Sequence, residues 1–287
     1  MTIHLSPRIS SDGWLPDTLK KLSISGCPDL TMLLLRTFPK ALERLSIISC
    51  SNLESTIETF ENNEFLKVIK FVDCDKLTFV PSDLHNLTFL ESILIWNCPN
   101  MEISFKFPNS LQELDIKDSP ILFVEEGVPT NLKLLYVANE AKIYKPLLKG
   151  ALQKITSLRR LVIARTPASL ASLSSLCLQS LTSLERLEIE NFPELKTIPN
   201  LGSLISLDSL WIKNFPNIEY IPDLGSLTSL LFLSIEECPK LKSIPDLGSL
   251  TSLESLWIEE CPKLKPLQSL SPPLTKLHIA RCPLLKR

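Results

Sequence analysis

The stretch LESLWIEECPKL, residues 253–264, contains the pattern that decides the fold of this chain of 287 residues. Residues 230–241 repeat the pattern as LLFLSIEECPKL, 23 positions earlier. Apolar and polar side chains alternate over its first six positions, which predicts a β-strand with one buried face. The proline after the cysteine cannot donate a hydrogen bond to a sheet, so we expect the strand to end by there.

Hexamers of the form L-x-x-L-x-[IVF], or close variants of it, recur along the whole chain. They begin at Leu19, Leu42, Leu66, Leu90, Leu111, Leu132, Leu158, Leu184, Leu207, Leu230, Leu253 and Leu274. Successive starts are 21 to 26 residues apart. This period is typical of leucine-rich repeats and lies outside the periods of ankyrin and helical-pair repeats. We therefore predict an α/β solenoid, a leucine-rich-repeat horseshoe of about twelve repeats with a parallel concave β-sheet.

A second signature, I-P-x-L-G-S-L-x-S-L, follows three of the strands and begins at Ile198, Ile221 and Ile244. Its leucine spacing of three predicts short turns or 3₁₀ segments on the convex side. The repeats are less regular between about residues 103 and 183, where we expect a bend or an altered surface. Within that stretch, ANEAKI (138–143) lacks cysteine and proline, and SLASLSSLCLQSL (169–181) lengthens one convex segment. No linker is evident, so the sequence predicts a single leucine-rich-repeat domain over residues 1–287.

Seven of the eight cysteines occupy one column of the repeat, eight residues after the first leucine. They are Cys27, Cys50, Cys74, Cys98, Cys238, Cys261 and Cys282. Other coils hold Ser119 or Phe192 in this column, which indicates selection for size and partial polarity. We expect buried, reduced thiols close to backbone groups of the adjacent coil. Metal ligands would need a closely spaced set such as C-x-x-C, which is absent, so no metal is expected.

Composition and motifs exclude several classes of function. With 30 basic and 32 acidic residues, the formal net charge is −2, which argues against a general nucleic-acid or anionic-membrane binder. There is no phosphate-binding loop, nucleophile elbow or H-E-x-x-H motif. His278 and Cys282 lie four residues apart, but the strand pattern directs the histidine outward and buries the cysteine. We expect neither catalysis nor a cofactor.

The amino-terminal residues and the hydropathy pattern bear on location. MTIHLSPRISSDGW has no cationic start followed by an apolar run, so it does not predict a signal peptide. No uninterrupted apolar stretch is long enough to span a bilayer. We therefore expect a cytoplasmic protein with no membrane insertion.

Candidate binding residues lie at the outward positions of the strands, which form the predicted concave face. Large exposed aromatic side chains are favoured interface anchors, so Trp211 and Trp257 are the leading candidates. Trp96 and Tyr136 are expected to form a second cluster. The charged candidates beside the tryptophans are Lys213, Glu236, Glu237, Glu259 and Glu260. An aromatic centre with an acidic rim would suit a partner that presents basic residues. Because the two tryptophans lie in near-identical repeats, duplication of a residue that only covers its neighbour is the competing interpretation.

The chain resembles the C-terminal leucine-rich-repeat region of plant nucleotide-binding leucine-rich-repeat disease-resistance proteins of the coiled-coil class. The resemblance rests on LERLSIISCSNL (42–53), on SIPDLGSLTSLESLWIEECPKL (243–264) and on the closing PPLTKLHIARCPLLKR. It implies a plant-defence recognition module that senses a pathogen effector or a guarded host protein. It also implies an autoinhibitory contact with the receptor's own nucleotide-binding module. The modules that bind nucleotide are missing here, so the chain would be a fragment or a truncated relative.

Two other interpretations remain. Repeat regions of F-box proteins, the substrate adaptors of ubiquitin ligases, also use cysteine-containing coils, but these run nearer 26 residues and carry full convex helices. The chain could also be a truncated remnant that has no partner. Helical content on the convex side distinguishes the adaptor from the immune-receptor interpretation.

Overall fold

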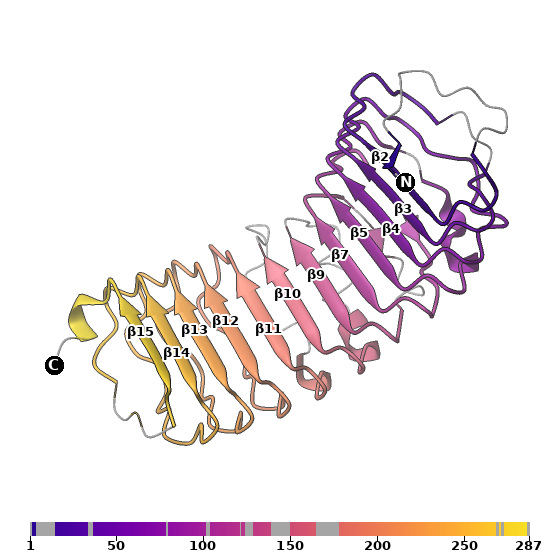
Figure 1. Cartoon of the computed structure of the whole chain (residues 1–287). Helices are drawn as coiled ribbons and strands as arrows, with labels where there is room; N and C mark the ends of the chain where they lie inside the picture. Colours follow the sequence, from indigo (N-terminus) through magenta and orange to yellow (C-terminus); the bar gives the residue numbers. More distant parts are fainter. Residues whose placement is uncertain are drawn as a thin grey trace. The chain divides into compact units, whose positions relative to one another are not determined.

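Each of the twelve hexamers forms a five-residue strand in the computed structural model (Figure 1). The structure describes residues 2–3, 15–33, 37–78, 80–101, 104–120, 122–123, 129–138, 150–164, 178–267, 270 and 273–285, and the structural statements below concern these residues. The chain divides into two compact units, Met1–Pro146 and Leu147–Arg287, here called the first and second units. The boundary between them lies within the irregular middle, residues 103–183. ANEAKI and SLASLSSLCLQSL lie mostly outside the described residues.

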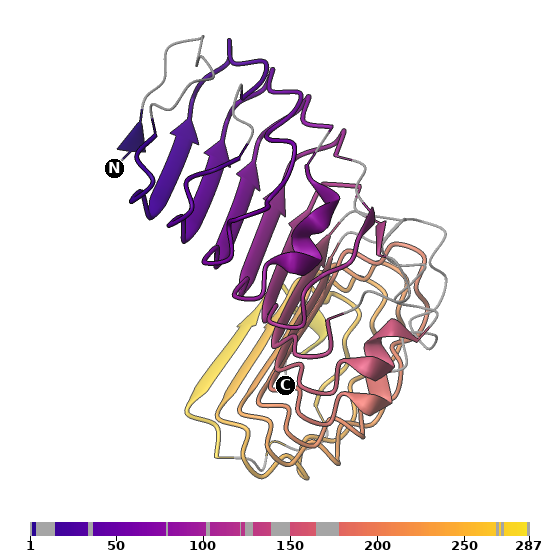
Figure 2. The ribbon, with the colours of Figure 1, turned by 90° about the vertical axis from the view of Figure 1, so that its right-hand side faces the viewer.

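In the first unit, seven strands pair in chain order and are all parallel. They are β1 (Thr2–Ile3), β2 (Lys21–Ser25), β3 (Arg44–Ile48), β4 (Val68–Val72), β5 (Ser92–Trp96), β7 (Glu113–Lys117) and β9 (Leu134–Ala138). Figure 2 shows these strands along one side of the coils and the 3₁₀ helix η1 (Ser82–Asn86) on the return side. A short parallel pair, β6 (Ser104–Phe105) and β8 (Leu122–Phe123), forms a separate sheet that the sequence did not predict.

In the second unit, six strands pair in the same way. They are β10 (Arg160–Ala164), β11 (Arg186–Glu190), β12 (Ser209–Lys213), β13 (Phe232–Glu236), β14 (Ser255–Glu259) and β15 (Lys276–Ala280). The described part of this unit also contains the 3₁₀ segments η2 (Ala151–Lys154), η4 (Leu178–Ser180) and η5 (Pro283–Leu285). The predicted solenoid with a parallel sheet and almost no helix is therefore confirmed.

The core is built from the second and fourth residues of each strand, as the alternation predicts. Leu233 and Ile235 of β13 are completely buried. They pair in register with the leucine and isoleucine of β12 and of β14, so like side chains stack from coil to coil. In β15 the equivalent Leu277 and Ile279 are 51% and 43% exposed, because among the described strands only β14 packs beside them. Burial of an inward side chain thus depends on a coil on each side.

The convex segments return through successive tight turns. In the coil 198–207, the backbone N–H of Leu204 donates to the carbonyl of Leu201, and that of Leu207 donates to Leu204. The side chain of Asn200 accepts from the N–H of Gly202, and Asp223 does the same for Gly225 one coil later. These polar side chains satisfy the backbone where the chain bends. The predicted short turns are confirmed in the I-P-x-L-G-S-L coils. Among the described residues, no helix has the length and apolar character that crossing a membrane requires.

In ten of the described coils, the residue directly after the strand adopts a left-handed conformation, in a series called here the left-handed column. It consists of Gly26, Ser49, Asp73, Asn97, Asp118, Asn191, Asn214, Glu237, Glu260 and Arg281, with φ between 50° and 63°. This conformation is unfavourable for a residue with a Cβ atom. A hydrogen bond compensates in most coils: the N–H of Glu237, for example, donates to the carbonyl of Glu259 at 3.0 Å. The column therefore adds one further backbone hydrogen bond between neighbouring coils beyond the end of the strand in these coils.

The cysteine column lies directly beyond the left-handed column and is buried. Cys50, Cys74, Cys98, Cys238 and Cys261 are completely inaccessible, and all seven described cysteines are free thiols. Each points its sulfur toward the carbonyl two residues earlier, at 3.3 Å for Cys238, and Cys261 also approaches the Ile235 carbonyl of the preceding coil at 3.9 Å. Where cysteine is replaced, Phe192 and Phe215 stack at 5.2 Å. The predicted burial of the column is confirmed; the eighth cysteine, Cys177, lies outside the described residues.

We expect the buried thiols to react with a thiol reagent only when the coils open. Burial raises the pKa of Cys50 to about 11, so at pH 8 its thiol stays protonated as well as inaccessible. The Cys177→Ser variant removes the eighth thiol from the measurement. In native buffer, DTNB should modify the five fully buried thiols of this variant roughly 1,000-fold more slowly than it does in urea. Rapid modification of several thiols without denaturant would contradict this packing, and a mass loss of two hydrogens per pair would reveal disulfides instead.

Candidate functional site

The candidate site is the outward face of the strands, formed by the first, third and fifth residue of each. In the second unit the register places Trp211 beside Ser234 and Ser234 beside Trp257. The two tryptophans are thus two strands apart, about 10 Å at the usual strand spacing. Both project from the face opposite the core, because strand side chains alternate. This agrees with the predicted arrangement along the sheet.

Trp211 is half-buried by two neighbours on adjacent strands. Its ring lies 4.7 Å from that of Phe232, measured between centroids and tilted by 35°. The guanidinium of Arg186, on the other side, lies 5.0 Å from the Trp211 centroid, within cation–π range. Aromatic and cationic contacts of this kind fix the orientation of the indole before any partner arrives.

Trp257 is the more exposed of the two tryptophans, with 36% of its surface accessible. Its indole stacks on the imidazole of His278 at a centroid distance of 3.6 Å, and its Nε1 donates to Glu259 Oε2 at 3.3 Å. The His278 Nε2 lies 3.9 Å from the same carboxylate oxygen. The result is an exposed aromatic pair with a carboxylate at its edge.

A buried serine separates the two aromatic groups. Ser234 is only 1% exposed, and its hydroxyl donates to Glu236 Oε1 at 2.6 Å. Each tryptophan therefore has its own aromatic neighbour on the following strand. The surface presents two aromatic positions rather than one continuous cluster.

In-chain cations already pair with most of the predicted acidic rim. The ammonium of Lys213 lies 3.4 Å from Glu236 Oε2 and 3.5 Å from Glu237 Oε1. Burial acts to lower the pKa of Lys213, but the charges of these two carboxylates outweigh it and raise that pKa. At the other end, Arg281 pairs with Glu259 and with Glu260. The rim is consequently a row of ion pairs in which carboxylates outnumber cations.

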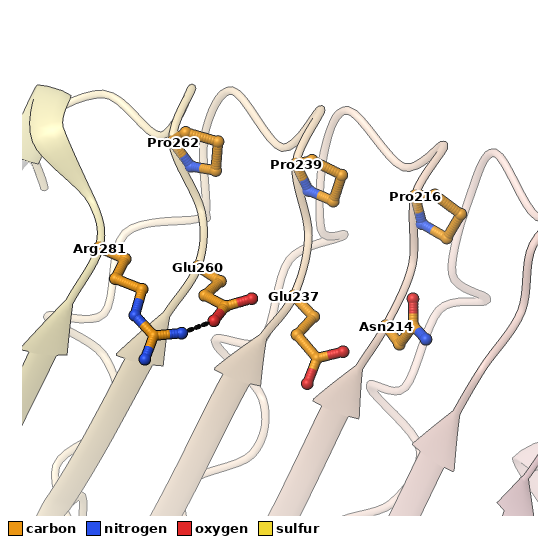
Figure 3. Close-up of a pocket in the computed structure, with 7 residues that line it drawn as sticks. All are labelled: Asn214, Pro216, Glu237, Pro239, Glu260, Pro262 and Arg281. Atoms are coloured by element: carbon orange, nitrogen blue, oxygen red, sulfur yellow. Dashed lines mark ion pairs between the residues drawn. The ribbon is translucent and has the colours of Figure 1, made fainter.

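The structure places the predicted glutamates in two different positions. Glu236 and Glu259 are the last residues of β13 and β14 and belong to the outward face. Glu237 and Glu260 lie one residue further on, in the left-handed column, and line a groove at the ends of the strands (Figure 3). The strand alternation could not locate these two residues, because it ends where the chain turns.

In the first unit, Trp96 and Tyr136 are connected through Asp115. The Trp96 Nε1 donates to Asp115 Oδ1 at 2.8 Å, and Asp115 pairs in register with Tyr136. The ammonium groups of Lys70 and Lys117 lie 5.9 and 6.0 Å from the Trp96 ring centroid. This second group of side chains is mixed in charge, with two lysines around one aromatic ring.

Sequence reasoning did not assign a role to the side chains that hold the tryptophans. Arg186, Phe232 and His278 are neighbours of the tryptophans on the strand before or after them. Aligning the repeats by their leucines places Arg186 and Phe232 two positions before the tryptophan column and His278 in that column itself, so that alignment was the available signal. In the described part of the chain, no group of three or more His, Cys, Asp or Glu side chains is arranged to hold a metal ion.

Comparisons with known proteins bear on the fold. Neither the protein-family models nor the curated proteins give a match. Among solved structures, the chain is similar to YopM, an effector from Yersinia pestis, with a TM-score of 0.63 and 20% identity over 99% of this chain and 84% of that one. A chain in the octameric complex of latrophilin 3, Unc5D and FLRT2 gives a TM-score of 0.55 and 17% identity, over 86% of this chain and 77% of that one. The leucine-rich-repeat domain of the type III effector XopL gives a TM-score of 0.50 and 17% identity, over 83% of this chain and 76% of that one. Together with the parallel strands and their period, these similarities establish a leucine-rich-repeat fold for this chain.

Proposed function

We propose that the chain is a protein-binding module that holds its partner on the outward face of β11 to β15. The observation that carries this proposal is the pair Trp211 and Trp257, two indoles on an otherwise ordinary sheet surface. Tryptophan is enriched among the residues that dominate interface energies. Both indoles are already oriented by neighbouring rings, which lowers the entropy lost on binding. The solved complex that contains FLRT2 offers a precedent for a repeat chain in a protein assembly.

The biological setting that we propose is plant immunity. Its support is the sequence resemblance to the repeat region of coiled-coil-class plant resistance receptors. On this proposal the chain acts in the cytoplasm as one leucine-rich-repeat domain over residues 1–287. It recognises a pathogen effector or a guarded host protein and, within a full receptor, contacts the nucleotide-binding module to restrain it.

The test compares three forms of the chain by proximity labelling in plant cells. Exchanging Trp211 and Trp257 for serine removes both anchors, and serine is the natural residue at this strand position in β2, β3 and β13. We expect one or a few labelled proteins to disappear. With a purified partner, the affinity should fall roughly 100-fold or more, since each buried hot-spot tryptophan contributes 2 kcal/mol or more.

The matched control is Tyr220→Ser, which removes an exposed aromatic side chain outside the strands of the same unit. Tyr220 is 56% exposed and forms an isolated bridge with Ser243, its counterpart one coil later, so serine fits this position. The control should label the same proteins as the unaltered chain. An unchanged set of labelled proteins with the tryptophan variant would remove the support for the proposal and favour the interpretation that the indoles only cover their neighbours.

The adaptor alternative receives less support from the convex segments. The coils 198–207, 221–230 and 244–253 return through turns closed by bonds between residues three apart, such as Leu227 N–H to Leu224. Full helices, which the adaptor class requires, would show bonds between residues four apart over several turns.

A further inference from the structure

A groove of about 440 Å³ runs along the carboxyl ends of the strands β12 to β15. Its lining repeats from coil to coil and consists of Asn214, Pro216, Glu237, Pro239, Glu260, Pro262 and Arg281. Figure 3 shows one row of polar side chains from the left-handed column and a second row of proline rings above it. Two carboxylates thus form a row beside a rigid apolar strip, at intervals of one coil.

The groove is held rigidly before any ligand binds. The backbone N–H of Asn214 donates to the Glu236 carbonyl at 3.0 Å, and that of Glu260 donates to the Ala280 carbonyl at 3.1 Å. These bonds fix the backbone from which the polar row projects. Proline rings have little conformational freedom to lose. A ligand therefore meets a preformed surface, and the entropy cost of binding is small.

Arg281 shows which chemistry fits this surface. It occupies the left-handed column in the last coil, where the two preceding coils have glutamate. Its guanidinium forms an ion pair with Glu260 inside the groove (Figure 3), and a second nitrogen lies 3.9 Å from Glu259 Oε1. One end of the groove is thus already occupied by an arginine of the chain itself.

One coil earlier, Glu237 occupies the equivalent position beside Pro239, with a lysine instead of an arginine as its cation. It shares the ammonium of Lys213 with Glu236, at 3.5 Å, and lies in the polar row between Asn214 and Glu260, with Pro239 of the same coil above it (Figure 3). A carboxylate accepts about four hydrogen bonds, so one shared ammonium leaves capacity for a further donor. A guanidinium suits this position because its planar fork bonds a carboxylate at its edge while its face lies on an apolar ring.

We propose that this groove binds an extended, arginine-containing segment of a partner protein, with one arginine side chain on Glu237 and Pro239. The arginine lies there as Arg281 lies on Glu260. This goes beyond the proposed function, because it names the chemistry of the partner and a surface outside the outward face. Binding here requires neither tryptophan.

The first test measures binding of a fluorescein-labelled Gly-Arg-Gly-Arg-Gly peptide by polarisation at about 0.1 M salt, where long-range charge effects are screened. The control peptide replaces arginine by citrulline, which has the same shape without the charge. We expect the arginine peptide to bind roughly tenfold more tightly than the citrulline peptide and to lose that advantage in Glu237→Gln. Glu254→Gln makes the same change at an exposed position outside the groove and should have no effect. Equal binding of the two peptides would overturn the proposal.

The second test removes the in-chain competitor. Arg281→Gln frees Glu260 and should raise the affinity for the arginine peptide about threefold or more. Lys276→Gln makes the same charge change at the opposite end of β15 and should leave the affinity unchanged. An equal rise in both variants would show a general charge effect and would refute a built site. The Trp211→Ser, Trp257→Ser variant should keep its peptide affinity, so failure of this inference is distinguishable from failure of the proposed function.

Discussion

Replacing Phe215 by alanine is expected to lower the free energy of unfolding by about 3–5 kcal/mol. Phe215 is completely buried and stacks on Phe192 with an interplanar angle of 10°. The two rings fill a column in which five other described coils have fully buried cysteines, so the local backbone is spaced for the larger side chain. Alanine would leave a cavity that the flanking coils cannot close, since each is fixed by its strand pairing.

The measurement for Phe215 is urea unfolding followed by circular dichroism. Tyr220→Ala, five residues further on, removes an exposed aromatic ring and should change the stability by no more than about 0.5 kcal/mol. A loss below about 1 kcal/mol for Phe215→Ala would mean that the stacked rings are not part of the core.

Replacing Leu233 by alanine should destabilise the protein by about 2–5 kcal/mol, whereas Leu277→Ala should cost less than half as much. The two leucines occupy the same strand position in β13 and β15, but Leu233 is completely buried and Leu277 is 51% exposed. The transfer free energy lost on truncation scales with the apolar area buried, which explains the difference. Because coils contact only their neighbours, the effect should be local.

Hydrogen exchange is the measurement that resolves this locality. In the Leu233→Ala variant, the backbone amides of β12, β13 and β14 should exchange faster than they do in the unaltered chain. The exchange rates of β2 to β5 should stay the same. Equal costs for the two leucines, or uniform acceleration along the chain, would contradict core packing between adjacent coils.

The strands could be predicted from the sequence because their signal is local. In each hexamer, the leucine and the isoleucine that face the core are two residues apart, and this spacing alone defines a strand and its buried face. The same logic placed Leu233 and Ile235 in the core, whereas the burial of the cysteines was predicted from the residue types that replace them in their column. The short β6–β8 pair escaped prediction, because two-residue strands have too few side chains to show a period.

The candidate site could be predicted only in part. The positions of Trp211 and Trp257 on the outward face follow from alternation. Their contacts with Phe232 and His278 do not, because these depend on which rotamer each ring adopts between two coils. The groove was missed for another reason: its polar row lies in left-handed residues, where alternation no longer indicates the direction of a side chain.

The period of 23 residues has a consequence for how such a surface can change over generations. Ser234 lies in register between Trp211 and Trp257, so the distance between the two indoles is set by the number of intervening coils. Gain or loss of one coil between them would alter this distance by about 4.8 Å. Each remaining coil would still pack against a coil with the same pattern of inward leucine and isoleucine. Recognition in this molecule can therefore diverge in discrete steps of length, independently of any change in the anchoring residues themselves.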